Sequence, residues 1–333
     1  MKHIGRLALF LFLAVNAFFI GMLLLTAYSP YINPEVHPVQ SCLGLTFPIF
    51  LVINFCFLVF WLIVRYRLAL VPLLGFLLCY PQIRTYMPFN MGPSGQPENS
   101  IKLLSYNIMS FGNMKKENGQ NPILNYIKNS KADIVCMQEY AGSETAKIHL
   151  NNKEIRQALK DYPYRHIKQV GKTGAGSQIA CYSKFPILSA RMLDYQSNYN
   201  GSMVYDIKIG KDTVLLINNH LESNKLTRED KVVYEDMLKD PKAGKVKSGI
   251  RQLVNKLAEA SAIRSAQARA IAQEIARSPY PSVIVCGDFN DSPISYAHRV
   301  ISQDLDDAFT ESGRGLGISY NQNKFYFRID NIL

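Results

Sequence analysis

The sequence predicts an α/β domain of packed β-sheets flanked by helices, preceded by transmembrane helices. Runs rich in apolar and β-branched residues indicate strands, and apolar residues recur at helical spacing from Ile250 to Arg277. Strands mixed with a few helices, without strict alternation, are typical of packed sheets covered by helices. The strand-like runs are IKLLSYNI, ADIVCMQEY, SQIACYS, MVYDIKI, TVLLINNHL, SVIVCGDF and FYFRIDNIL.

Charge is distributed unevenly along the 333 residues. Of the 37 Lys and Arg residues five lie in residues 1–100, and of the 26 Asp and Glu residues two do, so residues 101–333 hold 32 basic and 24 acidic side chains, a net charge of +8. A basic domain attracts nucleic acid, phosphorylated substrates or an anionic membrane surface. Ordinary solubility charge explains the same balance.

The six cysteines show neither a disulfide framework nor the spacing of a zinc site. Three of them lie in apolar stretches and three in strand-like runs. We therefore expect buried free thiols that act as small apolar side chains. These residues are Cys42, Cys56, Cys79, Cys136, Cys181 and Cys286.

Two uncharged runs, Leu7–Tyr28 and Ser41–Val64, have 22 and 24 residues. Roughly 20 apolar residues cross a hydrocarbon core of about 30 Å, so both predict transmembrane helices. A third run of 16 residues lies between Arg67 and Arg84 and contains two prolines. We predict a multi-pass membrane domain of two to three spans over residues 1–90.

Basic residues flank these runs on one side. Lys2 and Arg6 precede the first run, Arg65 and Arg67 follow the second, and the loop between the runs carries no Lys or Arg. The positive-inside bias then places these basic residues in the cytoplasm. If the third run spans the cytoplasmic membrane, the following domain is extracytoplasmic; if it does not, that domain is cytoplasmic. We expect the extracytoplasmic arrangement.

The segment 91–100, MGPSGQPENS, is rich in Pro, Gly and polar residues and is predicted to be a linker. It separates the membrane domain from a second domain that extends over residues 101–333.

Polar side chains follow several of the predicted strands of this second domain. After the apolar run that ends at Cys286, the sequence GDFND brings together Asp288, Asn290 and Asp291. Such a cluster at the end of a buried strand suits a functional site, although an Asp-Asn turn is also common. Other strand ends carry Asn107, Gln138 and Glu139, and alternation along one strand puts Asn218, His220 and Glu222 on one face.

These motifs, in this order, resemble the endonuclease/exonuclease/phosphatase superfamily, whose members have a deoxyribonuclease-I-like fold. The resemblance rests on LLSYNI, VCMQE, NNHL, GDFND and RID, with QIACYSKFPI as a central strand and turn. It spans essentially all of residues 101–333. It implies a four-layer α/β sandwich with the site at one edge of two packed sheets.

The resemblance also implies roles for single residues. Glu139 would be the principal ligand of Mg²⁺ or Mn²⁺, with Asn107 beside it, and oxygen ligands of this kind suit a hard cation. His220 would contact the scissile phosphate, and Asp288 would orient or activate the attacking water. Asn290 would hold a phosphate oxygen, and Asn218 is assigned to substrate binding with it.

One part of the family pattern is missing. The Asp of RID, here Asp330, is expected to pair with a histidine in a terminal Ser-Asp-His motif, but the sequence stops at Leu333. We expect either that the sequence lacks its C-terminal end or that activity is impaired.

Three functions are consistent with the sequence. The first is a membrane-anchored, metal-dependent phosphoesterase that hydrolyses a phosphodiester or phosphomonoester, with a lipid head group in the bilayer as one candidate substrate. The second is a membrane-tethered nuclease, for which the basic cluster from Lys242 to Lys256 would bind nucleic acid, although a solvated helix face explains that cluster equally well. The third is a catalytically impaired, membrane-anchored binding module.

Overall fold

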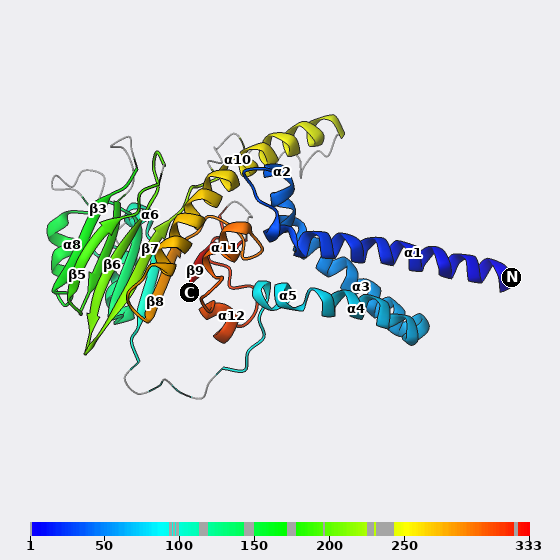
Figure 1. Ribbon diagram of the computed structural model, residues 1–333, viewed down its shortest axis with the longest axis horizontal. Coiled ribbons are helices and arrows are strands. Elements are labelled where there is room, and N and C mark those ends of the chain that lie inside the picture. Colours follow the sequence, from blue (N-terminus) through cyan, green and yellow to red (C-terminus); the bar gives the residue numbers. More distant parts are fainter. Residues whose placement is uncertain are drawn as a thin grey trace.

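The computed structural model describes the chain apart from residues 1, 93–94, 96, 98–99, 113–118, 143–149, 172–177, 196, 225–229, 231–242 and 323–325. Part of the expected linker and Lys242 therefore lie outside the described residues. Two parts are visible, an elongated group of helices and a sandwich of two sheets (Figure 1).

The N-terminal part consists of apolar helices. In the part of the chain that the structure describes, the segments Arg6–Tyr31 and Pro38–Leu78 are long and apolar enough to cross a membrane. The third predicted run is not one continuous helix. It is divided at Cys79 into α4, with nine residues, and α5, with seven. The elements are α1 (Lys2–Ala27), η1 (Ser29–Tyr31), α2 (Pro38–Ser41), η2 (Cys42–Thr46), α3 (Phe47–Arg65), η3 (Tyr66–Ala69), α4 (Leu70–Leu78) and α5 (Tyr80–Tyr86).

Buried polar side chains join α1 to α3. Trp61 Nε1 donates to Asn16 Oδ1 at 2.9 Å, and Asn54 Nδ2 donates to the carbonyl oxygens of Phe19 and Phe50 at 2.9 and 2.8 Å. Hydrogen bonds of this kind between apolar helices set which faces pack together. The chain turns back after α3, so the N-terminus and η3 lie at the end of the bundle far from the sheets (Figure 1).

The first sheet has the strand order β1-β2-β4-β3, with a parallel β1-β2 pair and antiparallel neighbours beyond it. The strands are β1 (Leu103–Asn107), β2 (Ile134–Tyr140), β3 (Tyr164–Gln169) and β4 (Gln178–Ser183). The helices of this half are α6 (Met109–Gly112), α7 (Pro122–Ser130) and α8 (Asn152–Ala158).

The second sheet has the order β5-β6-β7-β8-β9, and only its β7-β8 pair is parallel. The strands are β5 (Ile187–Met192), β6 (Gly201–Ile209), β7 (Asp212–His220), β8 (Ser282–Asp288) and β9 (Asp330–Ile332). Its helices are α10 (Ala243–Ala276), α11 (Tyr296–Ile301) and α12 (Ala308–Ser312). The predicted helix from 250 to 277 is thus confirmed, but it begins earlier, at Ala243.

The sandwich has four layers, two sheets with helices on both outer sides, and three apolar clusters lie between them. One contains side chains of both sheets and includes Cys136, Cys181 and Cys286, which confirms the prediction of buried thiols there. A second joins the first sheet to α7 and α8, and a third joins the second sheet to α10 and α11. The expectation was wrong for Cys56, which is exposed on the outer face of α3, and Cys42 is only partly buried.

The apolar helices dock on the sandwich through the ends nearest to it. A Cβ atom at Gly44 would overlap the carbonyl oxygen of Ile294, so only glycine allows this close approach. Glu35, in the loop between α1 and α3, accepts from Arg269 of α10 at 2.6 Å. Further contacts join Arg84 with Glu311, Arg299 with the Pro30 carbonyl, and Asn90 with the Thr310 carbonyl.

One buried carboxylate, Asp307, binds several groups where the C-terminal part of the sandwich meets α5. Asp307 caps α12 by accepting from Phe309 N and Thr310 N, and it also pairs with Arg328 and His298, both at 3.1 Å. Burial alone would raise the pKa of Asp307, but the hydrogen bond and charge of His298 and the charge of Arg328 hold it well below its usual value. Arg328 also donates to the Thr85 carbonyl at the end of α5, at 2.7 Å.

We predict that Asp307→Asn lowers the free energy of unfolding at pH 7 by about 3–5 kcal/mol, because the buried Arg328 loses its counter-charge. The folded-state pKa of Asp307 lies below its unfolded value of about 3.9, so its contribution is complete above that pH and is lost as the pH falls below it. The difference between wild type and variant should therefore shrink below about pH 4. Denaturant unfolding of the full chain in detergent measures both effects. The matched control is Asp304→Asn at an exposed position, and equal losses in the two variants would contradict the prediction.

Candidate active site

Polar side chains from both sheets meet at one edge of the sandwich. Asn107 ends β1, Glu139 lies near the end of β2, and His220 ends β7. In the second sheet, the register pairs His220 with Asp288 and Asp288 with Asp330. Five of the six residues that the sequence assigned to metal binding or catalysis thus lie at this edge. The sixth, Asn290, lies on the turn after β8, where its N–H donates to Asp288 Oδ1 at 2.8 Å.

A β-bulge presents Glu139 to this edge. The register of β2 and β4 shifts between Met137 and Tyr140, and Glu139 has a φ of +51°. A positive φ costs a side-chain-bearing residue about 1–3 kcal/mol and is found preferentially at functional sites. Asn107 Nδ2 donates to Glu139 Oε1 and to Asp288 Oδ2, both at 3.0 Å, so one amide bridges the two sheets.

The turn after β8 has two unusual backbone positions. Gly287 has a φ of +129°, and a Cβ there would overlap backbone atoms of Asn219, so the sequence GDFND needs its glycine. Asn290 has a φ of +52°, its N–H donates to Asp288 Oδ1 at 2.8 Å, and its Nδ2 donates to the Leu221 carbonyl at 2.9 Å. Because an amide NH₂ has two hydrogens, Asn290 retains one for a further acceptor.

His220 lies beside the carboxylates and is only 4% exposed. Its Nε2 is 3.6 Å from Glu139 Oε1. Burial lowers the pKa of His220, although the charges of Glu139, Asp330 and Glu222 act in the opposite direction.

Asp288 and Asp330 lie close to each other and to Glu139. Burial raises the pKa of Asp288 to about 6, while the hydrogen bond from Asn107 lowers it and the charge of Glu139 raises it. Burial and the charge of Asp288 raise the pKa of Asp330 to about 7. Asp330 Oδ1 is buried and has no hydrogen-bond partner among the described residues. Carboxylates that repel one another at a sheet edge form a site suited to a cation.

A family model described as endonuclease/exonuclease/phosphatase matches residues 104–333. The chain belongs to this family. A second model, described as a domain of unknown function, matches residues 9–86. A search of curated proteins finds no match.

Several solved structures are similar to this chain. D. rerio TDP2, complexed with a single-strand DNA product, is 16% identical with a TM-score of 0.46, and the match covers 71% of this chain and 83% of that one. The catalytic domain of human Nocturnin is 15% identical with a TM-score of 0.46, covering 70% and 80%. Sphingomyelinase C from Streptomyces griseocarneus is 19% identical with a TM-score of 0.40, covering 64% and 71%.

Enzymes of the endonuclease/exonuclease/phosphatase family generally use divalent metal ions. Within the described residues, no group of three or more His, Cys, Asp or Glu side chains could hold a metal ion. Mg²⁺, however, is commonly bound through only one or two carboxylates and retains several waters. Glu139 with Asn107 fits that kind of site, provided that the Asn107 amide turns its Oδ1, now accepting from Met109 N at 3.1 Å, toward the ion.

The position of Asn218 does not match the predicted role of this residue in substrate binding. Its side chain is completely buried between the sheets, where Oδ1 accepts from Gln138 Nε2 at 2.6 Å and Nδ2 donates to the Ala180 carbonyl at 3.2 Å. Alternation along β7 puts Asn218 on the same face of the strand as His220, but two residues further from the sheet edge. We therefore expect Asn218 to hold the two sheets together beneath the site.

Arg264 of α10 was missed by the sequence reasoning. It is 3% exposed and donates to Asp291 Oδ2 at 3.0 Å, to the Glu222 carbonyl at 2.9 Å and to Asn224 Oδ1 at 2.8 Å. One guanidinium thus joins the loops that follow β7 and β8. A signal existed, because position 264 is seven residues, or about two turns, from both Leu257 and Ile271 and so falls on the apolar stripe.

Ser319 was also missed. Its hydroxyl oxygen accepts from Ile329 N and Asp330 N, both at 3.1 Å, and so fixes the start of β9. Nothing in the local sequence distinguishes it from other loop serines.

We predict that Gly287→Ala lowers the free energy of unfolding by about 3 kcal/mol or more, because the new Cβ meets the Asn219 backbone as well as an unfavourable φ. The matched control is Gly210→Ala, which also has a positive φ, +61°, but open space around it. It should cost only about 1–2 kcal/mol. Denaturant unfolding of both variants gives the comparison, and equal losses would show that the close approach at Gly287 is unimportant.

Proposed function

We propose that this protein is a membrane-anchored, divalent-metal-dependent phosphoesterase that hydrolyses a phosphodiester or phosphomonoester. The observation that carries the proposal is the meeting of Asn107, Glu139, His220, Asp288 and Asp330 at one sheet edge in a chain of this family.

Each residue has a role in the proposed reaction. Glu139 and Asn107 hold Mg²⁺ or Mn²⁺, which when bound supplies positive charge to polarise the phosphate. Asp288, oriented by the Asn290 N–H, positions the attacking water and accepts its proton. His220 and the second hydrogen of the Asn290 amide donate to phosphate oxygens. The water oxygen bonds to phosphorus, the bond from phosphorus to the leaving oxygen breaks, and that oxygen takes up a proton.

Asp330 is proposed to stabilise an imidazole. The electrostatic interaction between Asp330 and His220 supports His220 as that imidazole. A carboxylate in this position favours the charged form of the ring and holds its orientation.

Membrane anchoring is supported by the arrangement of the apolar helices. The loop between α1 and α3 and the end of α5 both contact the sandwich, whereas η3 lies at the far end of the bundle (Figure 1). Arg65 and Arg67 are at that far end, so the positive-inside bias puts the sandwich on the extracytoplasmic side of a cytoplasmic membrane. The return of the chain through α4 and α5 provides the third crossing that this topology needs.

A nuclease is the second candidate, favoured by the net charge of +8 in residues 101–333. The basic cluster supports it less, because Lys256 is paired with Asp230, and Lys242 lies outside the described residues. A non-catalytic binding module is the third candidate. An assay of bis(p-nitrophenyl) phosphate and of single-stranded DNA, each with Mg²⁺, separates the three.

We predict Mg²⁺-dependent hydrolysis of bis(p-nitrophenyl) phosphate by the full chain and a loss of both Mg²⁺ affinity and activity in Glu139→Gln. The substitution keeps the shape of the side chain but removes the charge that a hard cation requires. Calorimetry measures Mg²⁺ binding, and release of p-nitrophenolate measures hydrolysis. The control is Glu259→Gln, which removes one exposed carboxylate from α10. Unchanged Mg²⁺ binding in Glu139→Gln would refute the ligand assignment, and metal binding without hydrolysis of either substrate would favour the binding module.

The topology gives a further prediction. A pair of reporters fused after Ser100, alkaline phosphatase and green fluorescent protein, should show activity only for alkaline phosphatase, which folds outside the cytoplasm. The control fusion after Arg67 should show the reverse, because that turn carries the basic residues of the cytoplasmic side. A fluorescent fusion after Ser100 would contradict the topology and reduce the third run to an interfacial segment.

A further inference from the structure

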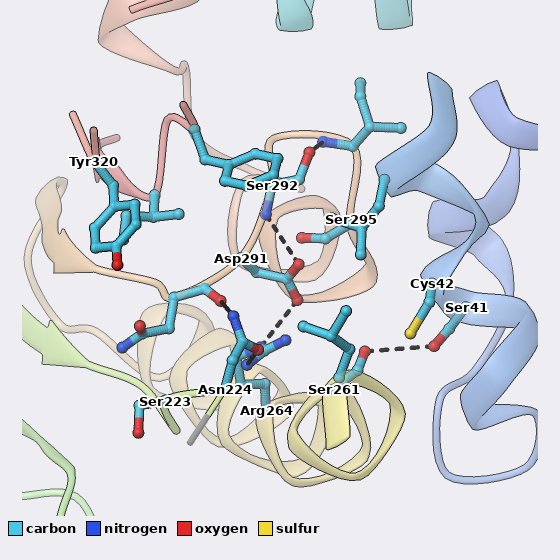
Figure 2. A pocket seen from close by; sticks show the side chains of 16 residues that line it. Ser41, Cys42, Ser223, Asn224, Ser261, Arg264, Asp291, Ser292, Ser295 and Tyr320 are labelled. Carbon is cyan, nitrogen blue, oxygen red and sulfur yellow. Dashed lines mark hydrogen bonds and ion pairs between the residues drawn. The ribbon is translucent and has the colours of Figure 1, made fainter. Parts of the chain in front are cut away.

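A cavity of about 310 Å³ lies between the apolar helices and the sandwich, next to the candidate active site. One wall comes from the turn before α3, with Cys42 and Leu45, and another comes from the segment with Tyr320 and Phe327. Leu257 is supplied by α10, which lies against the first wall, because the hydroxyl oxygens of Ser41 and Ser261 are 3.4 Å apart. Figure 2 shows the two walls facing each other, with Cys42 on one side and Tyr320 on the other. The volume falls at the lower end of the range for ligand pockets, roughly 300–1,000 Å³.

The cavity adjoins the reaction site at one shared residue, Asn290. Asn290, the residue proposed to hold a phosphate oxygen, also lines the cavity, as do Asn224 and Asp291. Asn224 Nδ2 donates to the Asn290 carbonyl at 3.3 Å, and the buried Arg264 joins Asn224 to Asp291 (Figure 2). A phosphate bound at Asn290 would therefore lie beside the cavity that this residue lines.

The cavity lies at the height of the proposed membrane boundary. Leu45 lines the cavity and comes two residues before α3 begins at Phe47. Phe47 and Ala27, the last residue of α1, belong to one apolar cluster with Ile294, which also lines the cavity. The segment that carries Tyr320 and Phe327 also exposes apolar side chains on this part of the molecule. These are Leu316, Ile318 and Tyr326, with 43%, 44% and 59% of their surface exposed.

The chemistry of the walls favours an apolar chain. Leu45, Leu257, Ile294, Phe327 and Ile329 supply most of the apolar contact. Arg264 is the one cation among the described lining residues, and its guanidinium is engaged by Asp291, the Glu222 carbonyl and Asn224. An anionic backbone would need unpaired cations along its path, as nucleic-acid grooves provide.

We propose that this cavity receives the apolar chain of a membrane amphiphile whose phosphate ester lies at Asp288 and Asn290. The inference rests on the proposed phosphoesterase function and narrows its substrate class to phosphate esters of lipids. The membrane helices then act as one wall of the substrate site as well as an anchor, and the amphiphile reaches the site from the surface of the bilayer.

The experiment compares two inhibitors that share a head group. Methylphosphonate and decylphosphonate are tested against hydrolysis of bis(p-nitrophenyl) phosphate by the full chain in lipid nanodiscs with Mg²⁺. Each buried methylene strengthens binding about fourfold, so three or four of them predict an inhibition constant at least about 50-fold lower for decylphosphonate. Thymidine 5′-monophosphate, which carries a base in place of the chain, should inhibit no better than methylphosphonate.

Two variants fill the cavity from two different elements, Leu257→Trp from α10 and Cys42→Phe from the turn before α3. Each should reduce the preference for decylphosphonate at least about tenfold, and thermal unfolding confirms that each variant is folded. The control is Leu188→Trp on β5, where the side chain is 59% exposed and distant from this cavity, and it should leave the preference unchanged. Partition of decylphosphonate into the bilayer acts equally on all of these proteins, so only the cavity variants report on the cavity.

The outcomes separate this inference from the proposed function. Equal inhibition by the two phosphonates, or a preference that both filled variants retain, would overturn the cavity assignment while hydrolysis still stands. Stronger inhibition by thymidine 5′-monophosphate than by decylphosphonate would overturn it in favour of a nucleotide substrate. If no hydrolysis occurs, the proposed function fails, and calorimetry of decylphosphonate with the Mg²⁺-loaded protein still tests whether the chain binds.

Discussion

Repulsion among the carboxylates at one sheet edge is the constraint that shapes the site. Glu139, Asp288 and Asp330 approach from three strands, and burial makes the charges of Asp288 and Asp330 costly, as the raised pKa values of these two aspartates indicate. The Asn107 amide offsets part of the repulsion by donating hydrogen bonds to Glu139 and Asp288. The strained backbone at Glu139 and Asn290 persists because the surrounding sheets hold it in place. Positive charge bound at this edge would reduce the repulsion.

The same edge of the sandwich is also where the apolar helices attach. Ile294 lies four residues after Asn290 and packs against Leu23, Ala27 and Phe47 of the helices. Gly44 approaches the Ile294 carbonyl so closely that no side chain fits between them. The loop that carries Asn290 is therefore held on one side by Arg264 and on the other by the apolar helices. Movement of the helices relative to the sandwich would be transmitted directly to this loop.

Local patterns predicted most of the strands and the long helix, and the family resemblance predicted the sandwich and the candidate site residues. Apolar runs such as VIVC before Gly287 indicated strands, and the polar residues that follow them turned out to share one edge. These residues meet because β1 and β2 form a parallel pair, as do β7 and β8, so the carboxyl ends within each pair lie at the same edge. The prediction was less accurate for Asn218, since alternation gives the face of a strand but not the depth beneath the surface. It was wrong for Cys56, because apolar flanks do not tell which face of a helix points outward.

The sequence by itself determined the apolar helices, the strands, the order of the motifs and the residue types that could bind a cation or a phosphate. These depend on composition and spacing within a few residues. Only the tertiary structure decided that Arg264 joins two loops, that Asp307 pairs with Arg328, and that the turn at Gly44 forms a wall beside Asn290. Those contacts join residues far apart in the chain, and their geometry follows from how the layers pack. The apolar stripe of α10 indicated that position 264 faces the core, but not which loops Arg264 would join.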